Sequence, residues 1–296
     1  MDPGGYPVHI RQMNRPLRWL RNALLGLVAI VILVLSVVYA RSEQIIRRTY
    51  SEPAKNVIVP TNQVAITEGM RLARIRGCIG CHGDNLEGQL FIDETLIATV
   101  ASPDLTRSVR ELSDSELERI IRRGIRPDGR SVVVMPSGMF APLRDEDLGK
   151  IIAYLRSVPA ANGQQRGVRL GPLARVMFTA GEFKPAAVEA REAAAASTFF
   201  PGPEAPTAEG AYIARTVCTE CHGMKLEGQG QRAPDLRIAA GYTLDQFTQL
   251  MRTGKAPGNR ELSLMSKVAR SRFSNFTDEE VRALHAYLVA RASSPR

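Results

Sequence analysis

The chain contains CIGCHGDNLEGQ at residues 78–89 and CTECHGMKLEGQ at residues 218–229. Each stretch has two cysteines three positions apart, a histidine directly after the second cysteine, and then Leu-Glu-Gly-Gln. These four cysteines are the only ones in the 296-residue chain. A repeat of this length predicts two similar domains, each built around one cluster.

Several kinds of chemistry use cysteines at this spacing. A disulfide framework needs no histidine beside each pair, and a thioredoxin-like motif would stand near a βαβ pattern, whereas the surroundings here have helical periodicity. A zinc site made from both clusters would join ligands 140 residues apart. Covalent attachment of a c-type haem uses all three residues, because cysteines at i and i+3 project from one side of a helical turn and the next residue lies beneath the iron.

The two clusters therefore predict two covalently bound haem c groups. Neutral imidazole supplies a nitrogen to one axial position of the iron. The predicted attachment and proximal ligand residues are Cys78, Cys81 and His82 for one haem, and Cys218, Cys221 and His222 for the other.

A second axial ligand decides what such a haem does, because an open position binds small molecules whereas a methionine thioether favours transfer of single electrons. The candidates are Met135, Met139 and Met265. An offset of 130 residues pairs Met135 with Met265 and leaves Met139 without a counterpart. Pro136 also biases Met135 toward an extended loop. Met135 and Met265 are the predicted distal ligands, and both belong to the predicted iron-binding set.

The basic excess is concentrated at the N-terminus. The net charge is +9, and the first 48 residues contribute +5 of it through seven arginines and two acidic residues. In the rest of the chain the excess of basic residues is too small and too scattered for a nucleic-acid-binding surface. We therefore expect no nucleic-acid partner.

The arginines flank an apolar run of 18 uncharged residues, 23–40. A helix of this length is about 27 Å long and can span a membrane. Arginines before the run, with Trp19 and Tyr39 at its ends, predict a retained single-pass anchor with a cytoplasmic N-terminus. A cleaved signal peptide is the alternative, since Val38-Tyr39-Ala40 has the form of a cleavage site. Both possibilities export the remainder of the chain.

The repeat extends beyond the motifs and is helical throughout. A helical stretch with Thr67 as its expected N-cap precedes the first cluster. Serine or threonine followed three residues later by glutamate or glutamine predicts capping boxes at residues 113–116, 243–246 and 277–280. No convincing alternating strand is present. The pattern predicts an all-α fold with one N-terminal transmembrane helix.

These features resemble a tandem of class I cytochrome c domains. In that family an N-terminal helix ends in CxxCH, a C-terminal helix crosses it, and a loop brings methionine to the other haem face. The resemblance implies that the Met135 and Met265 sets described above hold the two haems. The predicted parts are a tail and anchor at 1–48 with its helix at about 20–40, domains at 61–160 and 205–296, and a connector at 161–204.

The connector and one insertion do not repeat. We expect the connector to pack against both domains through Leu173, Val176, Met177 and Phe178. About ten additional residues follow Gln89 in the first half only, and the sequence assigns them no role.

The resemblance implies an electron carrier and not an enzyme: a membrane-anchored diheme cytochrome c that carries single electrons in a bacterial respiratory chain. Expected partners are the membrane and a quinol-oxidising complex, a periplasmic dehydrogenase or a terminal oxidase. The expected location is the bacterial inner membrane, with both haem domains in the periplasm. Alternatives are a cytochrome c subunit of a dehydrogenase or haem-copper oxidase, or a diheme peroxidase or thiosulfate-oxidising enzyme.

Overall fold

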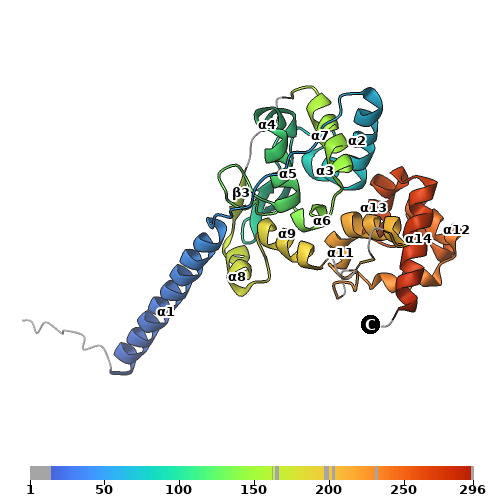
Figure 1. The fold of residues 1–296 in the computed structure, drawn as a ribbon. Helices are drawn as coiled ribbons and strands as arrows, with labels where there is room; N and C mark the ends of the chain where they lie inside the picture. Colours follow the sequence, from blue (N-terminus) through green and yellow to red (C-terminus); the bar gives the residue numbers. More distant parts are fainter. Residues whose placement is uncertain are drawn as a thin grey trace, which may run out of the picture.

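The computed structural model describes residues 15–161, 163, 167–196, 200–201, 204–230 and 233–294. It has one long helix and two helical lobes (Figure 1). The predicted N-terminal tail, residues 1–14, lies outside the described residues. The first lobe contains α2 (Gln63–Ile75), α3 (Cys78–His82), β1 (Leu90–Glu94), β2 (Ala98–Ala101), α4 (Leu105–Glu111), α5 (Asp114–Arg123), α6 (Ser137–Phe140) and α7 (Asp145–Ser157).

The connector and the second lobe complete the chain. The connector contains β3 (Val168–Leu170), α8 (Pro172–Ala180) and α9 (Ala186–Ala195). The second lobe contains α10 (Ala208–Ile213), η2 (Ala214–Cys218), α11 (Thr219–His222), η3 (Leu236–Gly241), α12 (Leu244–Thr253), β4 (Lys255–Ala256), η4 (Pro257–Asn259), β5 (Arg260–Glu261), α13 (Leu264–Ser271), η5 (Phe273–Asn275) and α14 (Asp278–Ser293).

The N-terminal helix α1 (Arg15–Ile46) extends beyond the predicted 20–40 at both ends. Pro16 lies in its first turn, where proline leaves no intrahelical bond unmade, and no proline follows it in the helix. None of the apolar window of α1 is buried by the described chain. Its length and composition allow it to cross a membrane, as a signal sequence would also allow.

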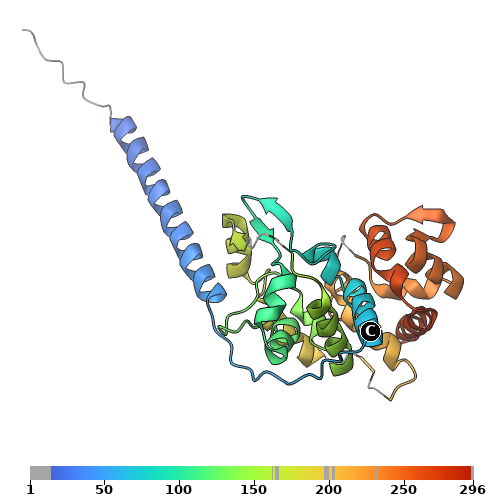
Figure 2. The same cartoon turned by 90° about the horizontal axis from the view of Figure 1, so that it is seen from above.

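Helix α2 begins earlier than expected. Its N-cap is Asn62, whose side chain accepts a hydrogen bond from the Ala65 amide at 2.9 Å. The prediction of Thr67 as the cap was wrong, because Asn62 is an equally strong cap and no helix-breaking residue separates the two positions. Figure 2 shows the extended chain after α1 wrapping along the first lobe before α2 begins. The three predicted capping boxes are confirmed, at Ser113 and Glu116, Thr243 and Gln246, and Thr277 and Glu280.

One close helix crossing organises each lobe. In the first lobe α2 crosses α7, and Gly69 lies directly against the backbone of Lys150. In the second lobe α10 crosses α14, and Gly210 lies in the same way against Ala283. A Cβ atom on Gly69 would stand 2.5 Å from the Lys150 carbonyl carbon, and one on Gly210 would stand 2.7 Å from that of Ala283. The absence of a side chain at these two positions permits both crossings.

The two hydrophobic cores meet at the interface between the lobes. Ile75, the last residue of α2, is 1% exposed and belongs to the core of the second lobe. Tyr212 of α10 packs in turn against the core of the first lobe. Arg71 of α2 also binds both carboxylate oxygens of Glu280, at 2.7 and 2.9 Å. The lobes are therefore packed against each other and joined by charge.

The residues inserted after Gln89 form a β-hairpin. Strand β1 pairs with β2, and β3 from the connector pairs antiparallel with β2 to complete a three-stranded sheet. The predicted helical fold class is confirmed, but the expectation of no strand was wrong for this insertion and for the short strands β3, β4 and β5. The short strands were missed because exposed and buried residues do not clearly alternate along them. In β1 nearly all residues are exposed.

The connector contacts both lobes, but largely through other residues than those predicted. Helix α9 packs against α6 and α5, and Phe200 stacks on Tyr287 of the second lobe with ring centroids 6.3 Å apart. Of the four predicted packing residues only Phe178 is buried. Leu173 and Val176 are exposed, because α8 turns Phe178 inward and packs against α1.

Candidate functional site

The two cysteine clusters lie on short helices that continue from the first helix of each lobe. In the first lobe Gly77, at φ 82°, turns the chain from α2 into α3. In the second lobe α10 runs through the π-helical turn η2 into α11 without a break. Each arrangement places two cysteines and a histidine on about one turn of helix.

The thiols do not form the structures that compete with haem attachment. Within the described residues all four cysteines are free of disulfides. No described group of three His, Cys, Asp or Glu residues has the arrangement of a metal site, so the two clusters do not combine into a zinc site. Burial raises the pKa of the Cys78 thiol to about 11 and that of Cys218 to about 12, which keeps both thiols protonated at neutral pH.

Both histidines are oriented by the same type of contact. The carbonyl oxygen of Pro103 lies 3.0 Å from Nδ1 of His82, and that of Pro234 lies 2.8 Å from Nδ1 of His222. Because a carbonyl only accepts, Nδ1 of each ring carries the proton and Nε2 keeps its lone pair. Burial lowers the pKa of both histidines and favours the neutral ring that binds a metal. The donor set therefore fits a haem iron in both lobes.

The repeated Leu-Glu-Gly sequence explains how the first of these carbonyls is positioned. The Gly88 amide donates to the His82 carbonyl at 2.7 Å, and the Leu105 amide donates to the Leu86 carbonyl at 2.9 Å. Leu86 is fully buried and has φ 62°, a conformation that is costly for leucine. This loop holds the chain around Pro103 against the histidine.

The second lobe repeats both of these hydrogen bonds. The Gly228 amide donates to the His222 carbonyl at 2.8 Å, and the Leu236 amide donates to the Leu226 carbonyl at 3.0 Å. Leu226 is also fully buried, with φ 60°. The sequence showed that Leu-Glu-Gly is repeated, but not that this loop places a carbonyl group beside each histidine. The prolines that orient the two histidines were missed, although both stand in the repeated Pro-Asp-Leu sequence.

The candidate methionines occupy related but unequal positions. Met135 is partly buried in the loop before α6 and packs against the first core, and Met265 is partly buried in the first turn of α13 and packs against the second core. Met139 is 3% exposed and fills the first core from within α6. The axial roles of Met135 and Met265 stay predictions.

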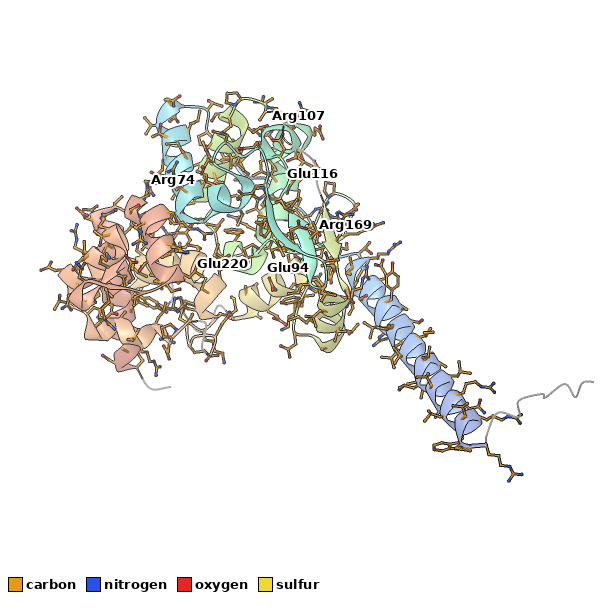
Figure 3. The ribbon with its side chains drawn as sticks, turned by 180° about the vertical axis from the view of Figure 1, so that it is seen from behind. Arg74, Glu94, Arg107, Glu116, Arg169 and Glu220 are labelled. Carbon is orange, nitrogen blue, oxygen red and sulfur yellow. The ribbon has the colours of Figure 1, made fainter. Side chains whose placement is uncertain are left out.

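An arginine that the sequence analysis did not single out lies between the two motifs. Arg272 belongs to the second lobe, yet its guanidinium faces Gly77 and Gly80 of the first lobe, close enough that a Cβ on Gly77 would stand 2.5 Å from Cζ. The same guanidinium forms an ion pair at 3.3 Å with Glu220, which lies inside the second motif. Figure 3 shows Glu220 beside the boundary between the lobes. The two motif helices therefore approach each other across one side chain.

Comparison with known proteins identifies the class that this fold and site define. The cytochrome c family model matches residues 66–159 and 207–291, which together make up more than half of the chain. The chain belongs to the cytochrome c family and has two cytochrome c domains in tandem. It accordingly carries two covalently bound haem c groups. The matched regions lie inside the predicted 61–160 and 205–296, whose exact limits stay predictions.

Two curated relatives are similar over most of the chain. One is the cytochrome c subunit of a quinone-dependent alcohol dehydrogenase from Gluconobacter oxydans (strain 621H), 22% identical over 271 residues that cover 79% of this chain and 56% of the relative. The other is the cytochrome c subunit of gluconate 2-dehydrogenase from Pantoea cypripedii, 23% identical over 269 residues that cover 77% of this chain and 59% of the relative. The matches thus span less than three fifths of either relative.

Proposed function

We propose that each haem is held by the four residues predicted from its own repeat. The two cysteines of each set would bind the ring and the histidine and methionine would bind the iron, while the carbonyls of Pro103 and Pro234 hold the histidines in their observed orientation. When bound, each haem supplies a one-electron iron couple. The proposed sets are Cys78, Cys81, His82 and Met135 in residues 61–160, and Cys218, Cys221, His222 and Met265 in residues 205–296.

We infer that the chain passes single electrons between its two haem sites and does not itself catalyse a reaction on a substrate. The observation that supports this role is the position of Arg272, which lies against α3 and forms an ion pair with α11. The cysteine-bearing helices of the two lobes therefore face each other, and the shared cores fix their separation. Such an arrangement suits transfer within the chain better than two independently tethered domains.

The proposed electron donor is a dehydrogenase, and the proposed acceptor is a component of the respiratory chain. Both relatives are cytochrome c subunits of dehydrogenases, which supports this choice over a freely diffusing carrier. We propose that α1 is retained as a single-pass anchor in a bacterial inner membrane, with the lobes on the periplasmic side, because the arginines cluster before its apolar run. A self-sufficient carrier remains the second candidate, since the described lobes form a complete pair of cytochrome domains.

Two experiments test these proposals separately. Replacing Met135 by Leu, or Met265 by Leu, should each remove half of the methionine-to-iron charge-transfer absorption of the oxidised protein, while the matched variant Met139→Leu keeps all of it. Retention of the full band in either ligand variant contradicts the assigned ligand. Mild extraction from native membranes should recover the chain with a dehydrogenase in fixed ratio, and recovery of the chain alone would support the self-sufficient carrier.

A further inference from the structure

The outward face of α8 is apolar and open. The helix turns Ala174 and Phe178 inward, where both are buried. It turns Leu173 and Val176 outward, with 48% and 43% of their surface exposed. Phe183, just after the helix, is 40% exposed and packs edge-on against Phe178. Within α8 the one charged residue is Arg175, which points to Glu43 of α1, so the outward face of the helix itself is uncharged, although the exposed Glu182 and Lys184 flank Phe183.

The turn of the β-hairpin extends this face. The Leu173 amide donates to the Leu96 carbonyl at 3.0 Å, and the Gly171 amide donates to the Ile97 carbonyl at 2.8 Å, so the turn lies at the start of α8. Leu96 is 70% exposed and Ile97 is 38% exposed. We call the resulting surface the α8 patch. It comprises Leu96, Ile97, Leu173, Val176 and Phe183.

Arg175 fastens α8 to the C-terminal end of α1. Its guanidinium binds Glu43 Oε1 at 2.8 Å, donates to the Ser42 hydroxyl at 2.9 Å, and lies 4.2 Å from the centroid of the Tyr39 ring. The two helices lie side by side there (Figure 1). Ser42 is fully buried beneath this contact. The position of α8 relative to α1 is therefore defined by both charge and packing.

Tyr39 marks the level of α1 at which this contact occurs. It lies one residue before the end of the apolar run, and tyrosine at such an end lies among lipid headgroups. The side chains of Leu35 and Val37, just before it, are more than half exposed in the described chain. Lipid would cover them if α1 spans a membrane. The α8 patch lies beside the same end of the helix and offers a second apolar surface to the same boundary.

We propose that the α8 patch rests in the interfacial layer of the membrane that α1 spans. This inference depends on the proposed role of α1 as a retained anchor. Apolar helix side chains at the level of the headgroups are typical of a segment that binds the membrane interface. Continuity with the lipid-facing side chains of α1 favours lipid over a protein partner. Contact at two places, the span and the patch, then fixes how the lobes are rotated above the bilayer.

A single introduced thiol tests this placement in the full-length holoprotein. The four native cysteines all belong to the haem motifs, so an introduced cysteine is the only thiol that reagents can label. Val176→Cys and Leu173→Cys place it in the α8 patch. Val64→Cys is the matched control, because Val64 is 81% exposed and its helix α2 lies on the side of the first lobe away from α1 (Figure 1). Each variant is reconstituted in nanodiscs of phosphatidylethanolamine and phosphatidylglycerol. The rates of labelling by a lipid-soluble and a charged maleimide are then compared.

The rate of labelling by the lipid-soluble maleimide is divided by the rate for the charged maleimide at the same cysteine, so that differences in local burial between sites do not affect the comparison. We expect the ratio of the lipid-soluble rate to the charged rate to be at least about tenfold higher at Val176 and Leu173 than at Val64, because an interfacial helix buries its apolar face at the boundary with the acyl chains, where a charged reagent does not reach. Equal ratios in protein that stays with the nanodiscs overturn the α8 proposal alone. Protection from both reagents also overturns it, since protein would then cover the patch. Failure of the holoprotein to associate with nanodiscs at all overturns the anchor and this inference together.

Discussion

The helix crossings predict that two glycines cannot be exchanged for alanine. A Cβ on Gly69 would stand 2.5 Å from the Lys150 carbonyl carbon and 3.1 Å from the Tyr154 Cβ. Carbon atoms in ordinary contact are separated by about 3.5–4.0 Å, so α2 and α7 would have to part by about 1 Å. The obstacle is backbone, which cannot rotate away as a side chain can. Gly69→Ala therefore disturbs the crossing itself.

The expected magnitude follows from two opposed effects. Overpacking of a core costs about 1–3 kcal/mol, and a backbone obstacle belongs at the upper end of that range. Alanine in a helix is about 1 kcal/mol more favourable than glycine, which offsets part of this loss of stability. The net loss for Gly69→Ala is about 2 kcal/mol in the free energy of unfolding of the first domain. For a domain of about 100 residues this corresponds to a fall of about 10 °C in Tm.

Thermal unfolding of the purified holoprotein, followed by Soret circular dichroism, measures this loss. Gly210→Ala should lower the Tm of the second domain by a similar amount, because its Cβ would stand 2.6 Å from that of Tyr287. Gly241→Ala is the control, since no atom lies within 4 Å of a Cβ there. If Gly69→Ala unfolds within 2 °C of the control, the close crossing of α2 and α7 does not exist as described and the reasoning fails.

Three further variants examine the interface between the lobes. Arg272→Gln removes a partly screened positive charge beside both motifs. It should lower the midpoint potentials of both haems by about 20–60 mV in a potentiometric titration. Unchanged potentials would exclude an effect of this charge on the haems. Glu280→Gln breaks the pair with Arg71 and should cost about 1 kcal/mol, seen as roughly fivefold faster limited proteolysis of the connector. Tyr212→Phe deprives Asp147 of its 2.5 Å hydrogen bond and should lower the urea midpoint of unfolding by an amount worth about 1–2 kcal/mol, with no change in the haem spectra.

The sequence was sufficient for features that depend on local chemistry. Capping boxes need only two residues three apart, and the cysteine and histidine of a haem motif need only one helical turn, so both appear directly in the printed chain. The tandem arrangement was visible because the repeat compares the chain with itself. The same local reasoning failed at Asn62, where two strong caps competed and helix propagation favoured the earlier one.

Features that depend on distant partners were not visible. Arg272 has no recognisable motif, and its position against Gly77 results from the packing of the two lobes. The roles of Pro103 and Pro234 depend on a loop in which a buried leucine adopts a positive φ, which no propensity would suggest. The strand β3 has only three residues and acquires its conformation from pairing with β2.

The three-stranded sheet links the insertion of the first half to the connector. Its middle strand belongs to an insertion that only the first half possesses, and one of its edge strands belongs to the connector. Without the hairpin, β3 would have no edge to join, and without β3 the inner strand of the hairpin would be left open. We expect insertion and connector to be inherited together, so that a relative lacking one also lacks the other. The first domain is then best excised for separate study with the connector through α9, and a fragment ending at residue 160 would lose the outer strand of its own sheet.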